Sequence, residues 1–226
     1  LENSAPYYAP EEFQVLLNDQ EQYTCDHNVF SLYGLAPDTE YRLTVRGETQ
    51  SAELLFRTAA ERCAIDVRAF GAVGDGVHDD TAAIQTVIGC LPENGRLVFP
   101  AGTYLSRPLM LKSHITLEFC EGATLLGWAN REDYPVIPGT VTARDGEELH
   151  FGGFEGNAVP MYQSLLTAQY AEDIRIIGPG TVDGNAQNSE WWVNVKEQTV
   201  PRPRLLFFNR CRDITVHGIT AQNAAS

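Results

Sequence analysis

Two adjacent tryptophans close to basic side chains form the most promising ligand-binding group in the sequence. Trp191 and Trp192 are followed by Lys196 and Arg202. An indole face can stack on a sugar ring, and a cation can hydrogen-bond to a carboxylate. The alternative is that the pair packs a loop onto the rest of the domain. We take Trp191, Trp192, Lys196 and Arg202 as candidate substrate-binding residues.

The acidic residues offer weaker candidates for acid–base chemistry. Asp79 and Asp80 are adjacent, and neighbouring carboxylates can raise the pKa of one member of a pair. Their place directly before an amphipathic segment favours helix capping instead. Asp75 and Asp183 stand in Asp-Gly turns, where the side chain serves local backbone bonding. We therefore assign no catalytic residue within residues 1–226.

Metal and cofactor sites are not predicted. Apart from the His217-Gly218 pair in a β-rich run, which we interpret as structural, the histidines are scattered without shared spacing. The five cysteines show no CxxC or Cys/His pattern of a metal site, and we interpret them as buried free thiols. The glycines near residue 74 are not followed by the Lys-Ser/Thr of a phosphate loop.

Charge and hydropathy exclude two classes of partner. The net charge of −14 argues against nucleic acid, whose phosphates need a basic surface. No run approaches the roughly 18 apolar residues that span a bilayer, so no membrane insertion is predicted. Residues Leu1 to Pro10 show no signal peptide, and the sequence leaves both a cytoplasmic and an exported location open. The oligomeric state is likewise open.

The first part of the chain, residues 1–60, has the alternation of a β-sandwich. Expected strands cover residues 13–17, 29–35, 41–46 and 52–58, with turn signals between them. The segment 35–41, Leu-Ala-Pro-Asp-Thr-Glu-Tyr, resembles the tyrosine corner of a fibronectin type III module. Such a corner places the Tyr41 hydroxyl on upstream backbone. We expect a partial module, whose first strands precede Leu1.

Residues 61–226 predict a parallel β-helix, in which short strands coil around one core. A helix is expected from Thr81 to about Cys90, with Ala82, Ile84, Val87 and Ile88 as its apolar face. Short β runs separated by Gly and Asn follow, and residues 165–174 are echoed by residues 205–214 forty positions later. Such repetition indicates a solenoid. The helix would plug its open N-terminal end, and the fold class is all-β.

Several motifs together resemble the polygalacturonase family of pectin-degrading glycoside hydrolases. They are Phe70–Gly76 with Asp79–Gln85, Phe99–Tyr104, Gly127-Trp128 to Pro135, Leu166–Ala168, and Gly178–Gly184 leading to Trp191-Trp192. The resemblance covers about residues 64–226 and implies a right-handed parallel β-helix of the pectin lyase-like type. The fibronectin-like module ahead of it resembles the exo-acting bacterial members.

The resemblance implies inverting hydrolysis of α-1,4-galacturonosidic bonds in pectic polysaccharide or oligogalacturonide, without a cofactor. The family carries its acid–base residues on an Asn-Thr-Asp segment, an Asp-Asp pair and a His-Gly pair, followed by a basic Arg-Ile-Lys segment. Asn-Thr-Asp and Arg-Ile-Lys are absent here. We expect the catalytic carboxylates beyond Ser226 and no hydrolytic activity from residues 1–226 alone. A pectate lyase-type enzyme and a non-catalytic carbohydrate-binding β-helix remain alternatives.

Overall fold

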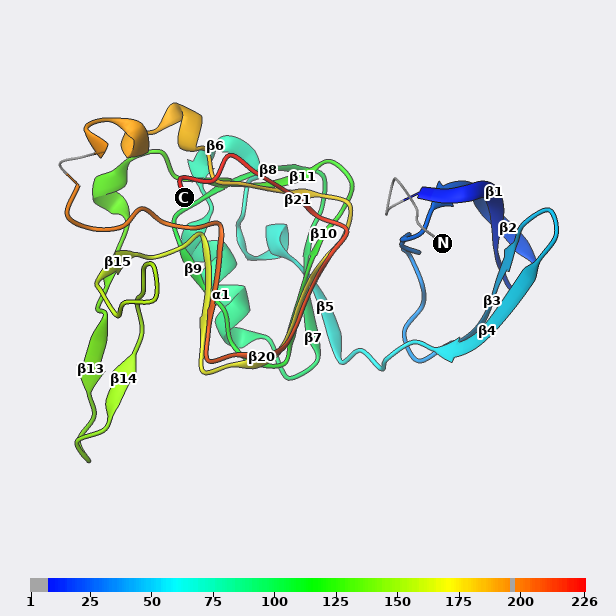
Figure 1. The fold of residues 1–226 in the computed structure, drawn as a ribbon, viewed down its shortest axis with the longest axis horizontal. Coiled ribbons are helices and arrows are strands. Elements are labelled where there is room, and N and C mark those ends of the chain that lie inside the picture. The colour runs from blue at the N-terminus through cyan, green and yellow to red at the C-terminus, as the bar shows by residue number, and fades with distance from the viewer. Residues whose placement is uncertain (1–7, 196–197) are drawn as a thin grey trace. The chain divides into compact units, whose positions relative to one another are not determined.

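The computed structural model describes residues 8–195 and 198–226 (Figure 1). The chain divides into two compact units, Leu1–Glu61 and Arg62–Ser226. The division falls one residue after the boundary expected from the sequence. Each unit has its own architecture.

The first unit contains one four-stranded antiparallel sheet in the order β2-β1-β3-β4. Its strands are β1 (Tyr8–Leu17), β2 (Gln20–His27), β3 (Glu40–Arg46) and β4 (Ser51–Arg57). Asn18 and Asp19 join β1 to β2 with φ of 49° and 65°, the paired positive values of a type I′ hairpin turn. The strand expected over residues 29–35 is wrong, because these residues form a loop. The second strand is instead formed by residues 20–27, whose mostly polar side chains do not show the apolar alternation expected of a strand.

Tyr41 makes the backbone contact that the tyrosine-corner motif predicts. Its hydroxyl oxygen accepts a hydrogen bond from the amide of Ala36 at 2.9 Å. The ring also stacks on Phe56 of β4, with centroids 5.7 Å apart. The described residues of this unit supply one sheet, whereas a sandwich has two. The fibronectin type III assignment therefore stays a prediction.

The second unit is a parallel β-helix, which confirms the predicted fold class. Three parallel sheets run along it, and neighbouring strands within each sheet come from successive coils. The first sheet contains β5 (Cys63–Asp66), β7 (Gly95–Phe99), β10 (Ile115–Phe119), β17 (Glu172–Ile177) and β20 (Arg212–His217). The second contains β6 (Asp75–Asp79), β8 (Gly102–Ser106), β11 (Ala123–Gly127), β18 (Thr181–Asp183) and β21 (Thr220–Gln222). The third contains β9 (Leu109–Met110), β16 (Leu166–Gln169) and β19 (Leu206–Asn209).

The repeat seen in the sequence is the stacking of two neighbouring coils. Leu166 pairs with Leu206, and Ile174 with Ile214, in unbroken parallel register. Asp173 and Asp213 occupy the same left-handed corner, with φ of 52° and 55°. Aspartate tolerates this conformation better than most residues because its short side chain bonds locally. A forty-residue spacing therefore places like residues directly above one another.

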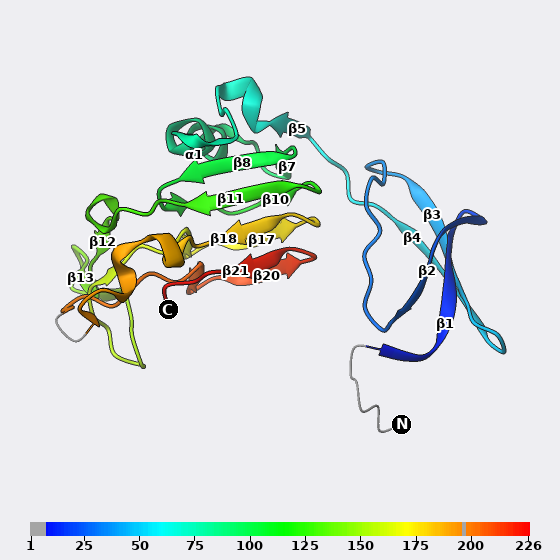
Figure 2. The ribbon, with the colours of Figure 1, turned by 90° about the horizontal axis from the view of Figure 1, so that it is seen from above.

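The core consists of the inward side chains of these coils and is closed at one end by a helix. Phe99 and Phe119 stack with centroids 4.4 Å apart. Helix α1 (Thr81–Cys90) has the predicted bounds and lies across the end of the stack (Figure 2). Ile84, Val87 and Ile88 are buried in that core, whereas Ala82 is exposed. Ala83 packs against the core in its place.

Candidate functional site

Two long insertions leave the β-helix at the same corner, between the second and third sheets. In the shortest coil, β8 ends at Ser106 and β9 begins at Leu109. In the next coil residues 128–165 intervene between β11 and β16, and in the one after it residues 184–205 intervene between β18 and β19. The two project from one side of the stack (Figure 1). We call residues 128–165 and 184–205 together the insertion face.

The first insertion carries two small antiparallel pairs. β12 (Val136–Ile137) pairs with β15 (Met161–Tyr162), and β13 (Thr140–Thr142) pairs with β14 (Glu148–His150) to form a hairpin. The second insertion contains the short 3₁₀ turns Ala186–Asn188 and Glu190–Trp192. Ser189 accepts a hydrogen bond from the Trp191 amide through its side chain, which helps to start the second turn. These local structures set the directions of the two tryptophans.

Trp191 fastens the two insertions to each other. Its side chain is fully buried, and its indole meets Tyr134 and Tyr162 edge-on, with centroids 5.0 Å away in both cases. Both tyrosines belong to the first insertion and Trp191 to the second. No face of the indole is left for a sugar, so a substrate-stacking role for Trp191 is wrong. The structural alternative, packing of the inserted loop, accounts for this residue.

Trp192, the next residue, has the opposite environment. Its side chain is 53% exposed, and the guanidinium of Arg202 lies 4.1 Å from the ring centroid. Arg202 Nη1 is buried and has no hydrogen-bond acceptor among residues 8–195 and 198–226. The tertiary structure thus joins two of the residues singled out from the sequence. Lys196, the remaining candidate, lies outside the described residues.

Two neighbouring cavities open at the insertion face. One of about 320 Å³ lies beside Arg202 and is lined by Phe154, Val195, Gln198, Thr199, Val200, Pro201, Arg202 and Ser226. The other, of about 300 Å³, is lined by Arg131, Tyr162, Asn194, Gln198, Thr199 and Val200. Residues 198–200 line both cavities. Arg131 is not among the candidate residues predicted from the sequence, although it lies inside the Gly127–Pro135 motif.

Carboxylates next to the insertion corner are engaged in structural bonds. Asp183 accepts hydrogen bonds from the side-chain amides of Gln222 at 2.8 Å and Asn223 at 2.9 Å. Asp133 accepts from the indole nitrogen of Trp128 at 2.9 Å. Arg107 lies over the Trp128 ring, 4.4 Å from its centroid. These groups hold neighbouring coils and the first insertion in place.

The paired aspartates before α1 take structural roles that differ from simple capping. Asp80 is buried and accepts the amides of Val73 at 2.7 Å and Gly74 at 3.0 Å, so its side chain orders the glycine-rich loop. Asp79 accepts the Thr81 amide at 3.1 Å and pairs with Arg107. Burial opposes ionisation of Asp79, but the bonds from Thr81 and the charge of Arg107 outweigh it and lower its pKa. Of these two side chains, only that of Asp79 accepts an amide at the start of the helix.

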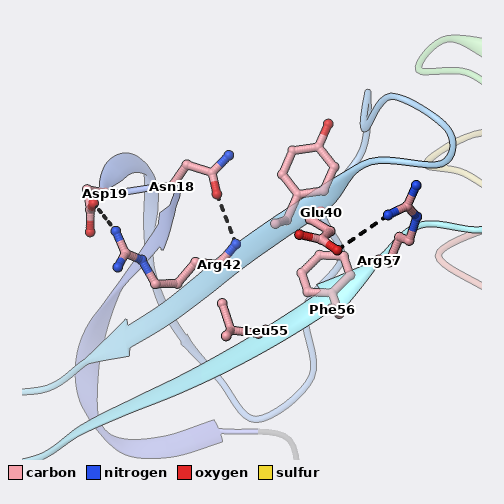
Figure 3. A pocket seen from close by; sticks show the side chains of 8 residues that line it. Asn18, Asp19, Glu40, Arg42, Leu55, Phe56 and Arg57 are labelled. Atoms are coloured by element: carbon pink, nitrogen blue, oxygen red, sulfur yellow. Dashed lines mark hydrogen bonds and ion pairs between the residues drawn. The ribbon is translucent and has the colours of Figure 1, made fainter.

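A further hollow belongs to the first unit and offers different chemistry. It measures about 650 Å³ and lies over β3 and β4 (Figure 3). Arg42 pairs with Asp19, and Arg57 with Asp38 at 2.9 Å and Glu40 at 3.3 Å. Both arginines of this hollow are therefore neutralised by carboxylates.

Within residues 8–195 and 198–226, no group of three or more His, Cys, Asp or Glu side chains is arranged to hold a metal ion. No helix in the same residues combines the length and the apolar character needed to cross a membrane.

One family model and several curated proteins match this chain in sequence. Residues 64–119 match the family model described as rhamnogalacturonase A/epimerase, pectate lyase-like. The exo-poly-alpha-D-galacturonosidase of Dickeya chrysanthemi is 34% identical over 163 residues, 67% of this chain and 26% of that protein. A probable polygalacturonase of Vitis vinifera is 31% identical over 196 residues, 80% of this chain and 38% of that protein.

A third relative is named as a binding protein and not as a hydrolase. The plasmin and fibronectin-binding protein A of Streptococcus pneumoniae is 38% identical over 126 residues, 50% of this chain and 17% of that protein. This chain thus spans between 17% and 38% of the length of these three curated relatives.

Solved structures agree on the fold. The family 28 exopolygalacturonase of Yersinia enterocolitica aligns with a TM-score of 0.69 at 21% identity, over 98% of this chain and 52% of that one. The hyperthermoactive exopolygalacturonase of Thermotoga maritima aligns with a TM-score of 0.57 at 25% identity, over 72% of this chain and 42% of that one. These structures support the parallel β-helix fold, and the sequence matches support a polygalacturonase-like family for the chain.

Proposed function

We propose that the whole protein is a pectin-degrading glycoside hydrolase that cleaves α-1,4-galacturonosidic bonds with inversion, and that the insertion face binds its substrate. The observation that carries this proposal is the Arg202 guanidinium, stacked on Trp192 beside a cavity, in a polygalacturonase-like β-helix. A guanidinium presents its donors in a planar fork that matches a carboxylate. Galacturonate carries one carboxylate on every sugar unit.

The proposed division of labour follows from the requirements of inversion. An inverting enzyme needs a protonated carboxyl beside the leaving oxygen and a carboxylate that activates water on the opposite face, roughly 6.5–9.5 Å apart. Asp79, Asp80 and Asp183 are committed to backbone and side-chain partners. In this proposal residues 1–226 bind and orient the polymer, and the two catalytic carboxylates follow Ser226.

The acidity of the chain gives the local cations their importance. A net charge of −14 repels a polyanion at long range, so binding has to come from short-range contacts with basic groups. The Arg202 Nη1 atom has no hydrogen-bond acceptor among the described residues. Arg202 also lines a cavity, where an incoming carboxylate could pair with the charge of its guanidinium.

The test of hydrolysis is a product analysis with the whole protein on polygalacturonate. Hydrolysis with inversion releases reducing ends whose first anomer is β, which nuclear magnetic resonance detects before mutarotation. A product that absorbs in the ultraviolet through a new double bond would indicate a lyase and overturn the proposal. An α anomer as the first product would overturn the inverting mechanism.

A second experiment addresses the division of labour. Residues 1–226 alone are expected to bind oligogalacturonate and to release no reducing ends from polygalacturonate. Release of reducing ends by this piece would show that the catalytic carboxylates lie within it, contrary to the proposal.

A non-catalytic binding protein is the second candidate function. It is favoured by the match to the plasmin and fibronectin-binding protein A and by the structural use of the carboxylates near the insertion corner. This candidate predicts that the whole protein binds its ligand without cleaving polygalacturonate. Turnover by the whole protein would exclude it.

A further inference from the structure

The two cavities of the insertion face each carry one arginine that has no carboxylate partner. Arg131 lines the cavity of about 300 Å³, and Arg202 lines the cavity of about 320 Å³. Among the described residues neither arginine makes a salt bridge. Elsewhere in the β-helix, Arg107 pairs with Asp79, and Arg212 with Glu172. Unpaired guanidinium groups in adjacent cavities, rather than on open surface, indicate places for anionic ligand groups.

Arg202 is held in position by its neighbours. Its guanidinium lies 4.1 Å from the centroid of the Trp192 ring, and a cation over an indole face is attracted by the ring quadrupole. Its Nη1 atom is buried without an acceptor among residues 8–195 and 198–226. The residue also lines the cavity of about 320 Å³, which gives a ligand access to the side chain. Trp192, with one face against the guanidinium, is a positioning residue for Arg202.

Arg131 projects from an anchored turn. It begins the short 3₁₀ helix Arg131–Asp133, which Asn130 caps by accepting the Glu132 amide at 3.1 Å. Asp133, at the other end of the turn, is bonded to the Trp128 indole at 2.9 Å. The following residue, Tyr134, is buried against Trp191. Arg131 thus stands on a turn fixed at both ends.

The chemistry of the residues between the arginines suits a sugar chain. Gln198 and Thr199 offer polar groups to both cavities, and Val200 offers an apolar surface to both. Gln198 is itself held in place, because its amide nitrogen donates to the carbonyls of Trp191 and Val193, both at 3.0 Å. Hydroxyl and C–H groups of sugars need this mixture of surfaces.

We infer that Arg131 and Arg202 bind the carboxylates of two different units of one uronate oligosaccharide, on either side of residues 198–200, and thereby select unesterified uronate over neutral sugar. The inference rests on the proposed function and adds Arg131 to the substrate site. Methyl esterification removes the negative charge of a uronate, so an esterified chain loses both ion pairs. The preference follows from charge, since the sugar rings are otherwise alike.

Binding of three matched trisaccharides to residues 1–226 tests the inference. They are trigalacturonate, its methyl ester, and the neutral α-1,4-linked galactose trimer, measured by isothermal titration calorimetry. Arg131→Gln and Arg202→Gln are each expected to weaken trigalacturonate binding about tenfold or more, and to leave binding of the neutral trimer unchanged. Arg144→Gln is the charge-matched control, because Arg144 is exposed in the turn of the β13–β14 hairpin and lines neither cavity.

Trp192→Leu tests the positioning role. It should weaken trigalacturonate binding less than Arg202→Gln does, and the double variant should bind no worse than Arg202→Gln alone. A further loss in the double variant would show that Trp192 contacts the ligand directly and would overturn its role as a positioning residue.

Three results would overturn the two-arginine site: no binding of trigalacturonate by residues 1–226, an unchanged affinity in either arginine variant, or an equal loss for charged and neutral trimers. Each of these could occur while the whole protein still hydrolyses polygalacturonate, so failure of the inference is distinguishable from failure of the proposed function.

Discussion

Replacement of Trp191 by alanine should open the insertion face while the β-helix stays folded. Trp191 belongs to a small buried cluster with Tyr134, Ala186 and Ala225, which is separate from the main core of the β-helix. Its indole packs against two tyrosines of the other insertion, and hydrogen bonds such as that from the Tyr162 amide to the Pro201 carbonyl at 3.2 Å also join the two insertions. Removing it takes the packing from both, while the strand ladders keep their hydrogen bonds.

The expected loss follows from burial and hydrogen bonding. Truncation of a fully buried tryptophan to alanine costs about 3–5 kcal/mol. The indole Nε1 of Trp191 has no acceptor among the described residues, so the variant also sheds an unpaired buried donor that costs about 1–3 kcal/mol. We therefore expect a loss near the lower end, about 3 kcal/mol. Trp191→Phe keeps an aromatic ring, removes the N–H group, and should lose less than about 2 kcal/mol.

Hydrogen exchange read by mass spectrometry separates local from global opening. About 3 kcal/mol corresponds to roughly hundredfold faster exchange in residues 128–165 and 184–205, with strands β10 and β17 unchanged. Trp192→Ala is the matched control, because the neighbouring indole is 53% exposed and its removal should change exchange little. Equal effects of the two alanine variants, or unchanged exchange in Trp191→Ala, would refute the assignment of Trp191 as the fastener.

Three further predictions concern the β-helical unit. Asp80→Ala leaves two loop amides without their charged acceptor, so urea unfolding should show a loss of at least about 2 kcal/mol; a loss below about 0.5 would contradict the loop-ordering role. Backbone bonds from His78 and its neighbour, and then the His78 ring, lower the pKa of Asp75 to about 2. Because this folded-state pKa lies below the unfolded value of about 3.9, the stabilisation is present above pH ~4 and is lost as the pH falls through about 2; a carboxyl titration by nuclear magnetic resonance with a midpoint near 4 would disprove it. Gly178→Ala should prevent stable folding, since its φ is 112° and a Cβ would stand 2.1 Å from a carbonyl oxygen of the neighbouring coil. Gly89→Ala in α1 would place its Cβ in open space and should raise the free energy of unfolding by up to about 1 kcal/mol. Similar melting temperatures for the two variants would contradict this prediction.

Local patterns in the sequence carry much of the fold. Helix α1 has its predicted bounds because its apolar spacing and the preceding aspartates act over a few residues. The repeated segments, with Leu166 over Leu206, become neighbouring coils because a solenoid stacks each repeat on the last. Strand β2 was not predicted from the sequence, because its polar residues lack the apolar alternation by which strands are recognised.

The candidate site depended on contacts between residues distant in the sequence. Trp191 and Trp192 are adjacent and chemically identical, yet one is fully buried against tyrosines of the other insertion and one carries Arg202 on an exposed ring. Their spacing allowed either role for both. Arg131 joined the site only because two insertions leave the β-helix at one corner. The sequence by itself thus determined the β-helical fold and the family resemblance, because both are recognised from motifs and repeats with local spacing. The tertiary structure decided which side chains are buried and which cations stay unpaired, because burial and pairing depend on partners from other coils.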